Sequence, residues 1–407
     1  MLVGATRSTG ARFALLCGAT LFEFIALGIY LAALPLFVTE ELGASRSAVG
    51  LAIGGFSLTA VLLRPSVGRG VDRNGRRLYL AAAPAILVVT SLLFVLVRAV
   101  PAVVVLRLLQ GVAGACFYTA AATVATDLAP DRRRAEYLSR FSLFLYGGLA
   151  VGPAVGEAVV GSFGYRWTWV AAAAAALVSL AVAVSLPETR PARAADYTAP
   201  PAPTGWARFL HPAAVGPGVV IITAAVGYTA ITGFSPLYAR HIGMSSSGPL
   251  YTTFAVTVLV VRLFAGRLAD RHGRVAVALP GMAIAASAMV LLALQPAPAL
   301  AFVGVGGFGA GFSLVFPALM ALTVDRVPEA ERGAAVGSFT AFFDIGSTSG
   351  SYAVGAVADH FGYGGAYGLP AGLCLVGMVV LARLGRRVRE EAAALADEAP
   401  WPEPSGA

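Results

Sequence analysis

Twelve runs of apolar residues, each long enough to cross a membrane, follow one another along the chain. A helix needs about 20 mostly apolar residues to span a hydrocarbon core about 30 Å thick, so twelve spans would use roughly 240 residues. The chain has 407 residues, of which 58% are hydrophobic and only 12% are charged. The pattern predicts an all-α membrane protein with 12 transmembrane helices. The predicted spans cover 13–38, 47–67, 78–97, 101–126, 138–163, 167–186, 214–238, 248–266, 275–295, 298–323, 334–357 and 365–384.

The distribution of arginine predicts how these spans are oriented. All 29 basic residues are arginine; 22 fall in loops on one side of the spans, four on the other side and three within spans. Cytoplasmic loops carry the excess of basic residues, so we expect both termini in the cytoplasm and a multi-pass protein of the cell inner (plasma) membrane. Arginine beside anionic lipid accounts for the net charge of +8, and we expect no nucleic-acid partner.

Several kinds of enzyme are excluded by the residues that the chain lacks. Without lysine it has neither a phosphate-binding P-loop nor a Schiff-base residue. Its cysteines, Cys17, Cys116 and Cys374, lie in apolar runs without metal-ligand spacing, and its four histidines are scattered. We expect no enzymatic activity, no cofactor and no metal site.

The two halves of the chain repeat at a constant offset of 198 residues. The segment from Arg64 to Arg76 returns as the segment from Arg262 to Arg274, and Asp127 returns as Asp325. Two six-helix bundles related by an axis along the membrane normal are a transporter architecture, with the substrate held between them. We therefore predict a six-helix bundle at 1–186, a cytoplasmic linker at 187–213, a second six-helix bundle at 214–385 and a cytoplasmic tail at 386–407.

The repeated turn carries charges that predict a cytoplasmic gate. Asp72 could cap a helix of the opposite bundle, where the helix dipole favours an anion. We expect the charge clusters to hold the outward-open state; the alternatives are helix packing alone and, for Asp127 and Asp325, a solvated helix end. The gate candidates are Gly68, Asp72, Arg73, Gly75, Arg76, Asp127 and Arg134, with Gly266, Asp270, Arg271, Gly273, Arg274, Asp325 and Arg332 in the second half.

Three motifs resemble those of the major facilitator superfamily, and this resemblance extends over the whole chain. The turns at Gly68 and Gly266 resemble its signature in loops 2–3 and 8–9. Arg107-x2-Gln110-Gly111 in the fourth span is similar to a signature of proton-coupled members. The fifth span resembles the antiporter signature, with Gly148-x3-Gly152-Pro153-x2-Gly156. The resemblance implies the major facilitator fold and a 12-span drug:proton antiporter. Glu157 departs from it, because the family usually has a second glycine there.

Charged residues within the spans are the candidates for energy coupling and for the substrate cavity. A charge inside a membrane is costly, so such a residue is a functional candidate by default. At 1.5 Å per residue, Glu23 and Asp344 lie about 15 Å deep, and Arg107 and Glu157 about 9 Å from the outer ends of their spans. We expect Glu23 to be the main proton or cation site, Asp344 the second, and Glu157 to pair with Arg107. The alternative is a static ion pair of Arg107 with Glu157 or Glu23.

Glycines and aromatic residues complete the predicted site. Gly148, Gly152 and Gly156 share one helix face, so we expect a close contact between the fifth and eighth spans that seals the cavity, or simple packing. We expect Trp167 and Trp169 to anchor the outer interface. Aromatic residues expected to line the cavity, unless they pack or face lipid, are Tyr30, Tyr146, Tyr228, Phe234, Phe312, Phe339, Phe342 and Phe343.

Together these observations predict a secondary active transporter that exports small lipophilic or cationic molecules in exchange for protons. Its expected partners are a small-molecule substrate, protons and membrane lipids, and we expect a monomer. The alternatives are a proton-coupled importer of a sugar or metabolite, and a membrane sensor that binds its ligand without moving it.

Overall fold

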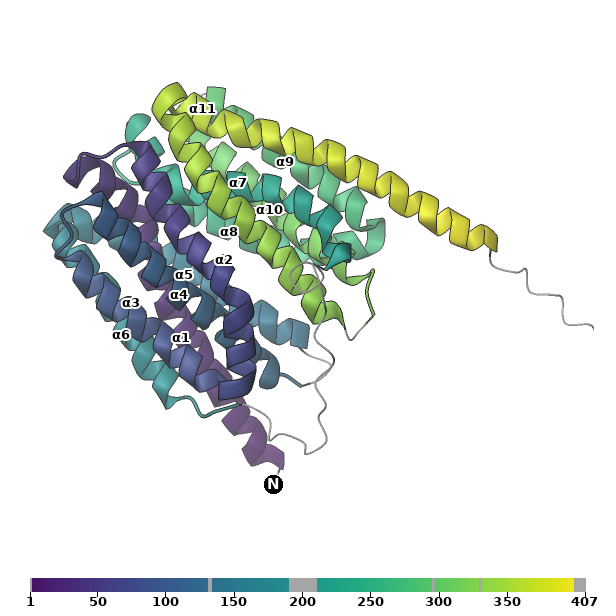
Figure 1. Ribbon diagram of the computed structural model, residues 1–407, viewed down its shortest axis with the longest axis horizontal. Coiled ribbons are helices and arrows are strands. Elements are labelled where there is room, and N and C mark those ends of the chain that lie inside the picture. The colour runs from purple at the N-terminus through teal and green to yellow at the C-terminus, as the bar shows by residue number, and fades with distance from the viewer. Residues whose placement is uncertain (1, 131–133, 190–210, 295–296, 329–330, 399–407) are drawn as a thin grey trace, which may run out of the picture.

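The computed structural model describes residues 2–130, 134–189, 211–294, 297–328 and 331–398, and within these ranges it contains helices and no strand (Figure 1). The first half forms α1 (Leu2–Leu36) with a π-helical end η1 (Phe37–Glu41), α2 (Arg46–Asn74), α3 (Arg76–Phe94), α4 (Val100–Asp127), α5 (Arg134–Phe163) and α6 (Tyr165–Ser185). The second half forms α7 (Pro212–His241), α8 (Gly248–His272), α9 (Arg274–Leu294), α10 (Pro298–Val324) and α11 (Arg332–Glu398).

The long helix α11 is two membrane spans joined at a bend. A straight helix of its 67 residues would be about 100 Å long, more than three times the thickness of a hydrocarbon core. Gly362 breaks the helical backbone with a φ of 65°, and the two halves fold back as a hairpin (Figure 1). Ten other helices are long and apolar enough to span, so the prediction of twelve spans is confirmed.

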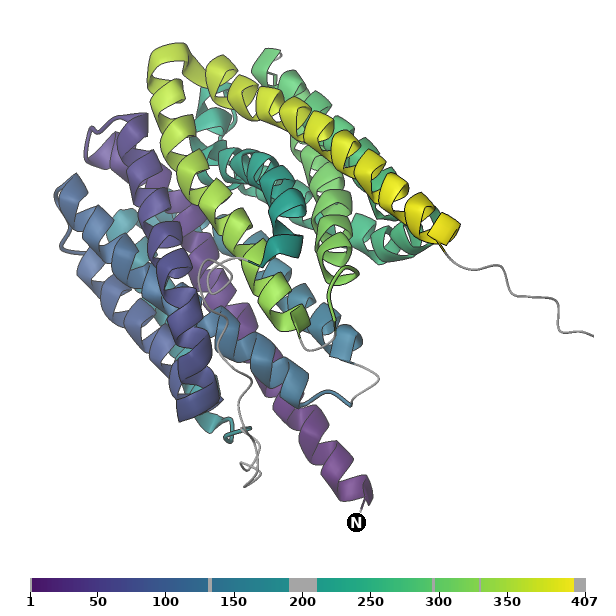
Figure 2. The same cartoon turned by 45° about the vertical axis from the view of Figure 1, so that its right-hand side comes forward.

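The helices form two bundles with the same internal packing, which we call the N-bundle (α1–α6) and the C-bundle (α7–α11) (Figures 1 and 2). In the N-bundle α2 packs on α4 and α3 on α6; in the C-bundle α8 packs on α10 and α9 on α11. Between the bundles, α2 packs on α11 and α8 on α5. The repeat in the sequence is therefore also a repeat in space.

Glycines with positive φ repeat in the same way. They form the pairs Gly43 and Gly243, Gly75 and Gly273, and Gly164 and Gly362. A side chain is strained at positive φ, so glycine is the residue that can turn the chain at these helix boundaries. Gly75 and Gly273 end α2 and α8, with φ values of 97° and 91°. They mark the end of the molecule that carries the arginine clusters, which we call the Arg-rich end; the other four mark the opposite end.

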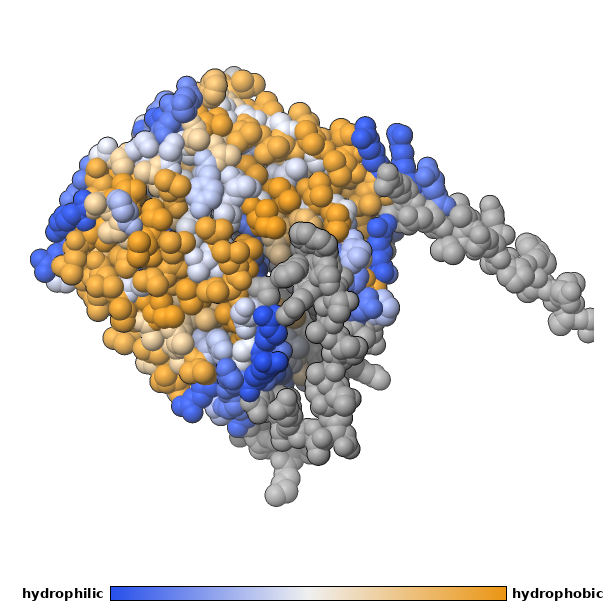
Figure 3. All heavy atoms as spheres, in the orientation of Figure 1, coloured by the Kyte–Doolittle hydropathy of each residue, from blue (hydrophilic) through white to orange (hydrophobic). Residues whose placement is uncertain are grey.

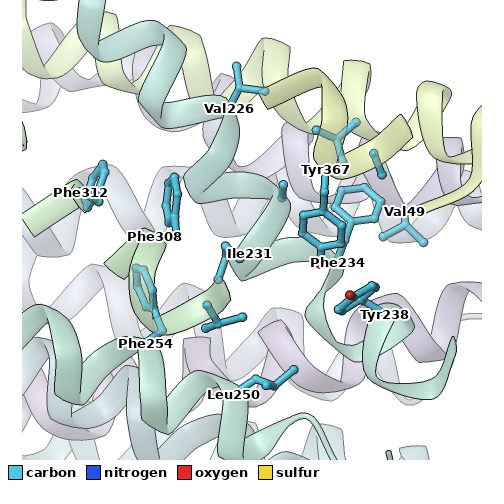
Figure 4. Close-up of a cluster of buried hydrophobic side chains, with 14 of the residues drawn as sticks. Val49, Val226, Ile231, Phe234, Tyr238, Leu250, Phe254, Phe308, Phe312 and Tyr367 are labelled. Carbon is cyan, nitrogen blue, oxygen red and sulfur yellow. The ribbon is translucent and has the colours of Figure 1, made fainter. Parts of the chain in front are cut away.

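Apolar side chains fill each bundle and also cover much of its outside. Phe308 packs between Phe254 and Phe312, with ring centroids 6.5 and 6.0 Å away, at the contact of α8 with α10 (Figure 4). Figure 3 shows hydrophobic residues over the middle of the visible face and hydrophilic residues gathered toward its edges. An apolar outer surface of this kind suits contact with lipid chains.

One of the two tryptophans that we expected at the outer interface is instead buried. Trp167 is 56% exposed, whereas Trp169 is 1% exposed and stacks on Tyr30 with ring centroids 5.0 Å apart. Successive helical residues are about 100° apart around the axis, so two residues separated by one position face nearly opposite directions. The prediction was wrong for Trp169, whose indole belongs to the core of the N-bundle.

Candidate functional site

A cavity lies between the two bundles and is formed by two adjoining pockets of about 250 and 230 Å³. Both pockets are lined by residues of α1, α2, α4, α5, α7 and α11, and α8 and α10 add residues to the first. The residues lining both are Phe24, Arg64, Tyr118, Leu149, Tyr228, Phe343 and Asp344. A chamber shared by two similar bundles is where this architecture holds its substrate.

An ion pair crosses this cavity from one bundle to the other. Arg64 of α2 lies 2.6 Å from Asp344 of α11, measured from Nη1 to Oδ2. Arg64 also lies over the ring of Tyr118, with its guanidinium carbon 5.9 Å from the ring centroid. The structure therefore places Asp344 in the predicted cavity, facing Arg64, which the sequence analysis did not select as a site residue.

A second arginine faces the cavity from the repeated position. Arg262 of α8 stands 198 residues after Arg64, and its guanidinium carbon lies 5.0 Å from the ring centroid of Tyr146. Among the described residues Arg262 makes no ion pair, and its buried Nε has no hydrogen-bond partner. The signal that could have identified both arginines was their matched position inside two equivalent spans.

Arg107 is buried in the N-bundle, but its partners are not acidic. Its Nη1 donates a 2.8 Å hydrogen bond to Oε1 of Gln110, and its Nε donates to the carbonyl of Ala52. Its guanidinium also lies over the rings of Tyr30 and Phe56. The expected pairing with Glu157 is absent, as is the alternative pairing with Glu23. Arg107 still lines one wall of the cavity.

Glu23 is buried inside the N-bundle rather than in the cavity. It is 1% exposed, interacts with Ser179 of α6, and lines neither of the two pockets that form the cavity. Its Oε2 atom has no hydrogen-bond partner. An unpaired buried carboxylate is costly, so Glu23 remains a candidate proton site, but one that lies outside the cavity.

Glu157 joins the two bundles at the opposite end. Its carboxylate accepts hydrogen bonds from the backbone N–H groups of Ser247, at 2.7 Å, and Gly248, at 3.0 Å, where α8 begins. The hydroxyls of Ser246 and Ser247 donate to it as well. A carboxylate at a helix start satisfies free N–H groups and the helix dipole. The departure from the family's glycine thus has a structural role.

Asp359, at the end of the first half of α11, makes the corresponding contact with the N-bundle. Its Oδ1 accepts the N–H of Arg46 at 2.9 Å and its Oδ2 the N–H of Ser47 at 2.8 Å, where α2 begins. The Arg46 side chain donates to the carbonyl of Ala358. The two carboxylate caps, which we call the Glu157 clasp and the Asp359 clasp, close the opposite end. Sequence analysis identified neither clasp: it paired Glu157 with Arg107 and did not select Asp359, because the partners of both carboxylates are far away in the chain.

At the Arg-rich end the predicted gate residues form ion pairs within each bundle. Arg76 lies 3.0 Å from Asp127, and at the repeated positions Arg274 lies 3.2 Å from Asp325. Asp72 lies 3.6 Å from Arg76 of its own bundle, rather than at a helix of the opposite bundle. The sequence analysis grouped these residues in one charge cluster without pairing Arg76 with Asp127 or Arg274 with Asp325. Among the described residues, the expected contact of Asp72 with the opposite bundle is not made.

Other residues complete or limit this picture of the Arg-rich end. Glu188 accepts the N–H groups of Arg76 and Arg77 at the start of α3, a cap that the sequence analysis did not identify. Arg73 and Arg271 are exposed, and Gly68 has open space beside it. The side chains of Arg134, Asp270 and Arg332, and the surroundings of Gly266, lie outside the described residues.

The glycine face of α5 packs closely, as predicted, but on α1 and not on α8. A Cβ atom on Gly152 would lie 2.7 Å from the Cα of Gly28, closer than real Cβ atoms approach, and Gly148 and Gly156 also face α1. Pro153 contacts Gly28 in the same interface. The glycines therefore bring two helices of one bundle together, and the contact of α5 with α8 is made by Glu157 and its neighbours.

The expected aromatic lining divides into two groups. Tyr146, Tyr228, Phe312 and Phe343 line the cavity, together with Tyr118, which the sequence analysis did not select. The others are buried in the bundles: Tyr30, Phe234, Phe339 and Phe342. Tyr30 donates a 3.0 Å hydrogen bond to Ser91. Because nearly every helix face is apolar here, the sequence pattern does not separate cavity rings from packed rings.

Comparisons with known proteins agree with this architecture. The model of the Major Facilitator Superfamily matches residues 16–261 and 246–405. An uncharacterized MFS-type transporter of Salmonella typhimurium (strain LT2), STM4428, is 26% identical over 392 residues, covering 93% of this chain and 98% of that protein. A second uncharacterized MFS-type transporter, from Burkholderia pseudomallei (strain 1106a), is 28% identical over 359 residues, with 84% of each chain covered.

Solved structures share the fold at low sequence identity. The nucleoside transporter NupG superposes with a TM-score of 0.72 at 14% identity, covering 91% of this chain and 98% of that one. The human organic anion transporter MFSD10 superposes with a TM-score of 0.69 at 16% identity, covering 92% and 99%. Since the family model covers nearly the whole chain and the two bundles have the matching fold, this chain belongs to the Major Facilitator Superfamily and is a membrane transporter, not an enzyme.

Proposed function

We propose that this chain is a proton-coupled secondary transporter that moves small organic molecules by alternating access. The observation that carries the proposal is the cavity between the bundles, which is crossed by the Arg64–Asp344 ion pair and closed at the opposite end by the two clasps. Clasps made of hydrogen bonds between rigid bundles can open as a unit. Transport of this kind needs two arrangements of the bundles that differ little in free energy.

The Arg-rich end is the cytoplasmic end in this proposal, because arginine-rich loops stay in the cytoplasm. The conformation then faces inward, with the outer side closed. In the outward-facing state the Arg-rich turns of the two bundles would meet, and Asp72 and its neighbours would exchange partners within a bundle for partners across bundles. The predicted domain boundaries, the monomeric state and the lipid contacts remain part of this proposal.

Asp344 and Glu23 are the proposed proton-binding residues. Asp344 lies in the cavity and pairs with Arg64, so a substrate that reaches either residue changes the partner of the other. Glu23 lies outside the cavity, beside α6, and would act through the packing of the N-bundle. Export in exchange for protons is the direction favoured by the resemblance of the fifth span to antiporters.

Import is the second candidate, and the Arg64–Asp344 ion pair is the observation that favours it. A proton on Asp344 would release Arg64, so a substrate that binds Arg64 would bind together with the proton rather than in competition with it. Protons and substrate would then cross the membrane in the same direction.

Accumulation of fluorescent probes in efflux-deficient bacteria tests the proposal. The probes are ethidium, carboxyfluorescein loaded as its ester, and Nile red, which are cationic, anionic and neutral. We expect the chain to change the steady-state level of at least one probe, and we expect Asp344→Asn or collapse of the proton gradient to abolish the change. Lower accumulation supports export and higher accumulation supports import. No change for any probe, with the chain present in the membrane, would contradict transport of this substrate range.

A further inference from the structure

Two arginines from repeated positions face one cavity, and they are not balanced by acidic residues. Arg64 and Arg262 both line the same pocket, and each guanidinium lies over a tyrosine ring there: Arg64 is 5.9 Å from the centroid of Tyr118 and Arg262 is 5.0 Å from that of Tyr146. Arg107 adds a third positive charge to the wall of the adjoining pocket. Among the described residues that line the two pockets, Asp344 is the only carboxylate. The cavity therefore has an excess of positive charge.

The pairing of these groups shows where that excess lies. Asp344 is already engaged by Arg64 at 2.6 Å. The guanidinium of Arg262 lies over the ring of Tyr146 and, in the part of the chain that the structure describes, is not paired with an acidic residue. Its Nε is buried without a hydrogen-bond partner. The Nε of Arg64 is likewise buried without a partner. Unsatisfied buried donors on a charged group are costly, unless a ligand supplies the acceptor.

A planar guanidinium recognises a carboxylate through two parallel hydrogen bonds, which is the geometry that suits a ligand here. The walls between the arginines are aromatic. Tyr228 packs against Phe312 and Phe343, with ring centroids 5.3 and 5.4 Å away. Aromatic faces of this kind pack well against a flat ring. The pocket volumes of about 250 and 230 Å³ leave room for a molecule of one or two rings.

We propose that the cavity binds a flat organic monocarboxylate, held by Arg262 and Arg64 and covered by Tyr118, Tyr146 and Tyr228. This inference rests on the proposed transport function and names its substrate class. It replaces the expectation of a cationic substrate, because a cation would have to displace Arg64 from Asp344 beside two further arginines, and Glu23 does not reach the cavity.

Equilibrium binding to the purified full chain in lipid nanodiscs tests this class directly. Three radiolabelled probes share one ring system and differ in charge: 2-naphthoate, 2-naphthamide and 2-naphthylmethylammonium. We expect naphthoate to bind at least tenfold more tightly than either of the others. Equal or tighter binding of the amide or the ammonium would overturn the inference, and so would the absence of naphthoate binding. This comparison needs no variant, so it holds even if substitutions in the cavity impair folding.

The arginines are then tested by substitution. Arg262→Gln should weaken naphthoate binding at least tenfold, and Arg262→Lys should restore part of it, because the charge returns without the planar pair of donors. Arg240→Gln is the matched control; Arg240 is an exposed residue of α7 whose partner at the opposite end is Glu40, 3.8 Å away. Unchanged naphthoate binding by Arg262→Gln would overturn the assignment of this residue.

Binding and transport can fail separately. Naphthoate that binds to the protein but does not cross the membrane of proteoliposomes under an imposed pH gradient would contradict the transport function and leave the anion site standing. Export of ethidium by a protein that does not bind naphthoate would support the transport function and overturn the anion site.

Discussion

At the scale of single residues, the close packing of α1 on α5 depends on glycines that leave no space for a side chain. Gly152 of α5 and Gly28 of α1 bring two backbones together, and a Cβ atom on Gly152 would also lie 2.5 Å from the carbonyl oxygen of Ile25. Small residues on facing helices allow such an approach in membranes.

Gly152→Val should therefore lower the stability of the protein. We expect a loss of about 1–3 kcal/mol, the usual cost of overpacking a close contact, seen as a lower midpoint temperature of unfolding in detergent. Gly161→Val on the same helix is the control, since nothing lies within 4 Å of the position of its Cβ atom. Equal midpoints for the two variants would show that the α1–α5 contact yields more easily than the geometry indicates.

Residue types were easier to predict than the direction in which each residue points. Charges within spans identified Glu23, Arg107, Glu157 and Asp344 as candidates, and the structure places Asp344 and Arg107 at the cavity. Glu23 instead faces α6, and Glu157 faces the start of α8. In a water-soluble helix the apolar stripe reveals the buried side, but a membrane helix is apolar all round, and this information is lost.

At the scale of whole helices, we expect the two clasps to control how easily the opposite end opens. Each uses a carboxylate of one bundle to cap a helix of the other, and hydrogen bonds to charged groups contribute about 1.5–3 kcal/mol each. The Glu157 clasp holds α8 to α5, and the Asp359 clasp holds α2 to α11. Loss of either charge should favour the outward-open arrangement.

Glu157→Gln should speed the labelling of a cavity cysteine from outside the cell. The reporter is Ser57→Cys, on the cavity wall, in a chain whose three buried native cysteines are replaced by alanine. A membrane-impermeant maleimide on right-side-out vesicles reads the labelling rate. If the substitution weakens the clasp by about 1.4 kcal/mol, the labelling rate should increase roughly tenfold.

Glu40→Gln serves as the comparison for that experiment. It makes the same chemical change at the same end, but the contacts of Glu40 are exposed: an ion pair with Arg240 at 3.8 Å and a 3.1 Å hydrogen bond from Tyr165 of its own bundle. Exposed ion pairs contribute little. Its labelling rate should stay near that of the unmodified protein. A Glu157→Gln rate no faster than the Glu40→Gln rate would mean that the clasp does not limit opening.

Glu188→Ala should destabilise the start of α3. Its carboxylate accepts two backbone N–H groups there, and loss of such a cap costs about 1 kcal/mol. The midpoint temperature of unfolding should fall in Glu188→Ala. It should fall less in Glu188→Gln, which keeps an acceptor oxygen. Identical midpoints for alanine and glutamine would indicate that the cap contributes nothing measurable.

Helix positions were largely predictable, because length and hydropathy define spans directly. The span predicted at 78–97 is α3 (Arg76–Phe94), and that predicted at 298–323 is α10 (Pro298–Val324). Contacts between helices were less accessible. The glycine face of α5 correctly indicated a close neighbour but not which one, since glycine spacing describes one surface and carries no information about its partner.

At the scale of the whole molecule, alternating access requires the bundles to separate at the opposite end in every cycle. Linking them there should stop transport without altering either bundle. Glu157→Cys with Ser246→Cys places one thiol on each bundle, on either side of the point where the carboxylate and hydroxyl now meet. The native cysteines, all buried, are again replaced by alanine. The transport readout is whichever of ethidium, carboxyfluorescein or Nile red the unmodified chain moves.

Crosslinking of this pair by a bifunctional methanethiosulfonate should reduce transport to the background of cells lacking the protein, and a reducing agent should restore it. Glu40→Cys with Tyr165→Cys is the matched pair, because Glu40 and Tyr165 also meet at the opposite end, by a 3.1 Å hydrogen bond, but both belong to the N-bundle. Its crosslinking should leave transport intact. Full transport by the crosslinked Glu157–Ser246 pair would mean that the substrate crosses without separation of α5 from α8, and alternating access by movement of the two bundles would have to be abandoned.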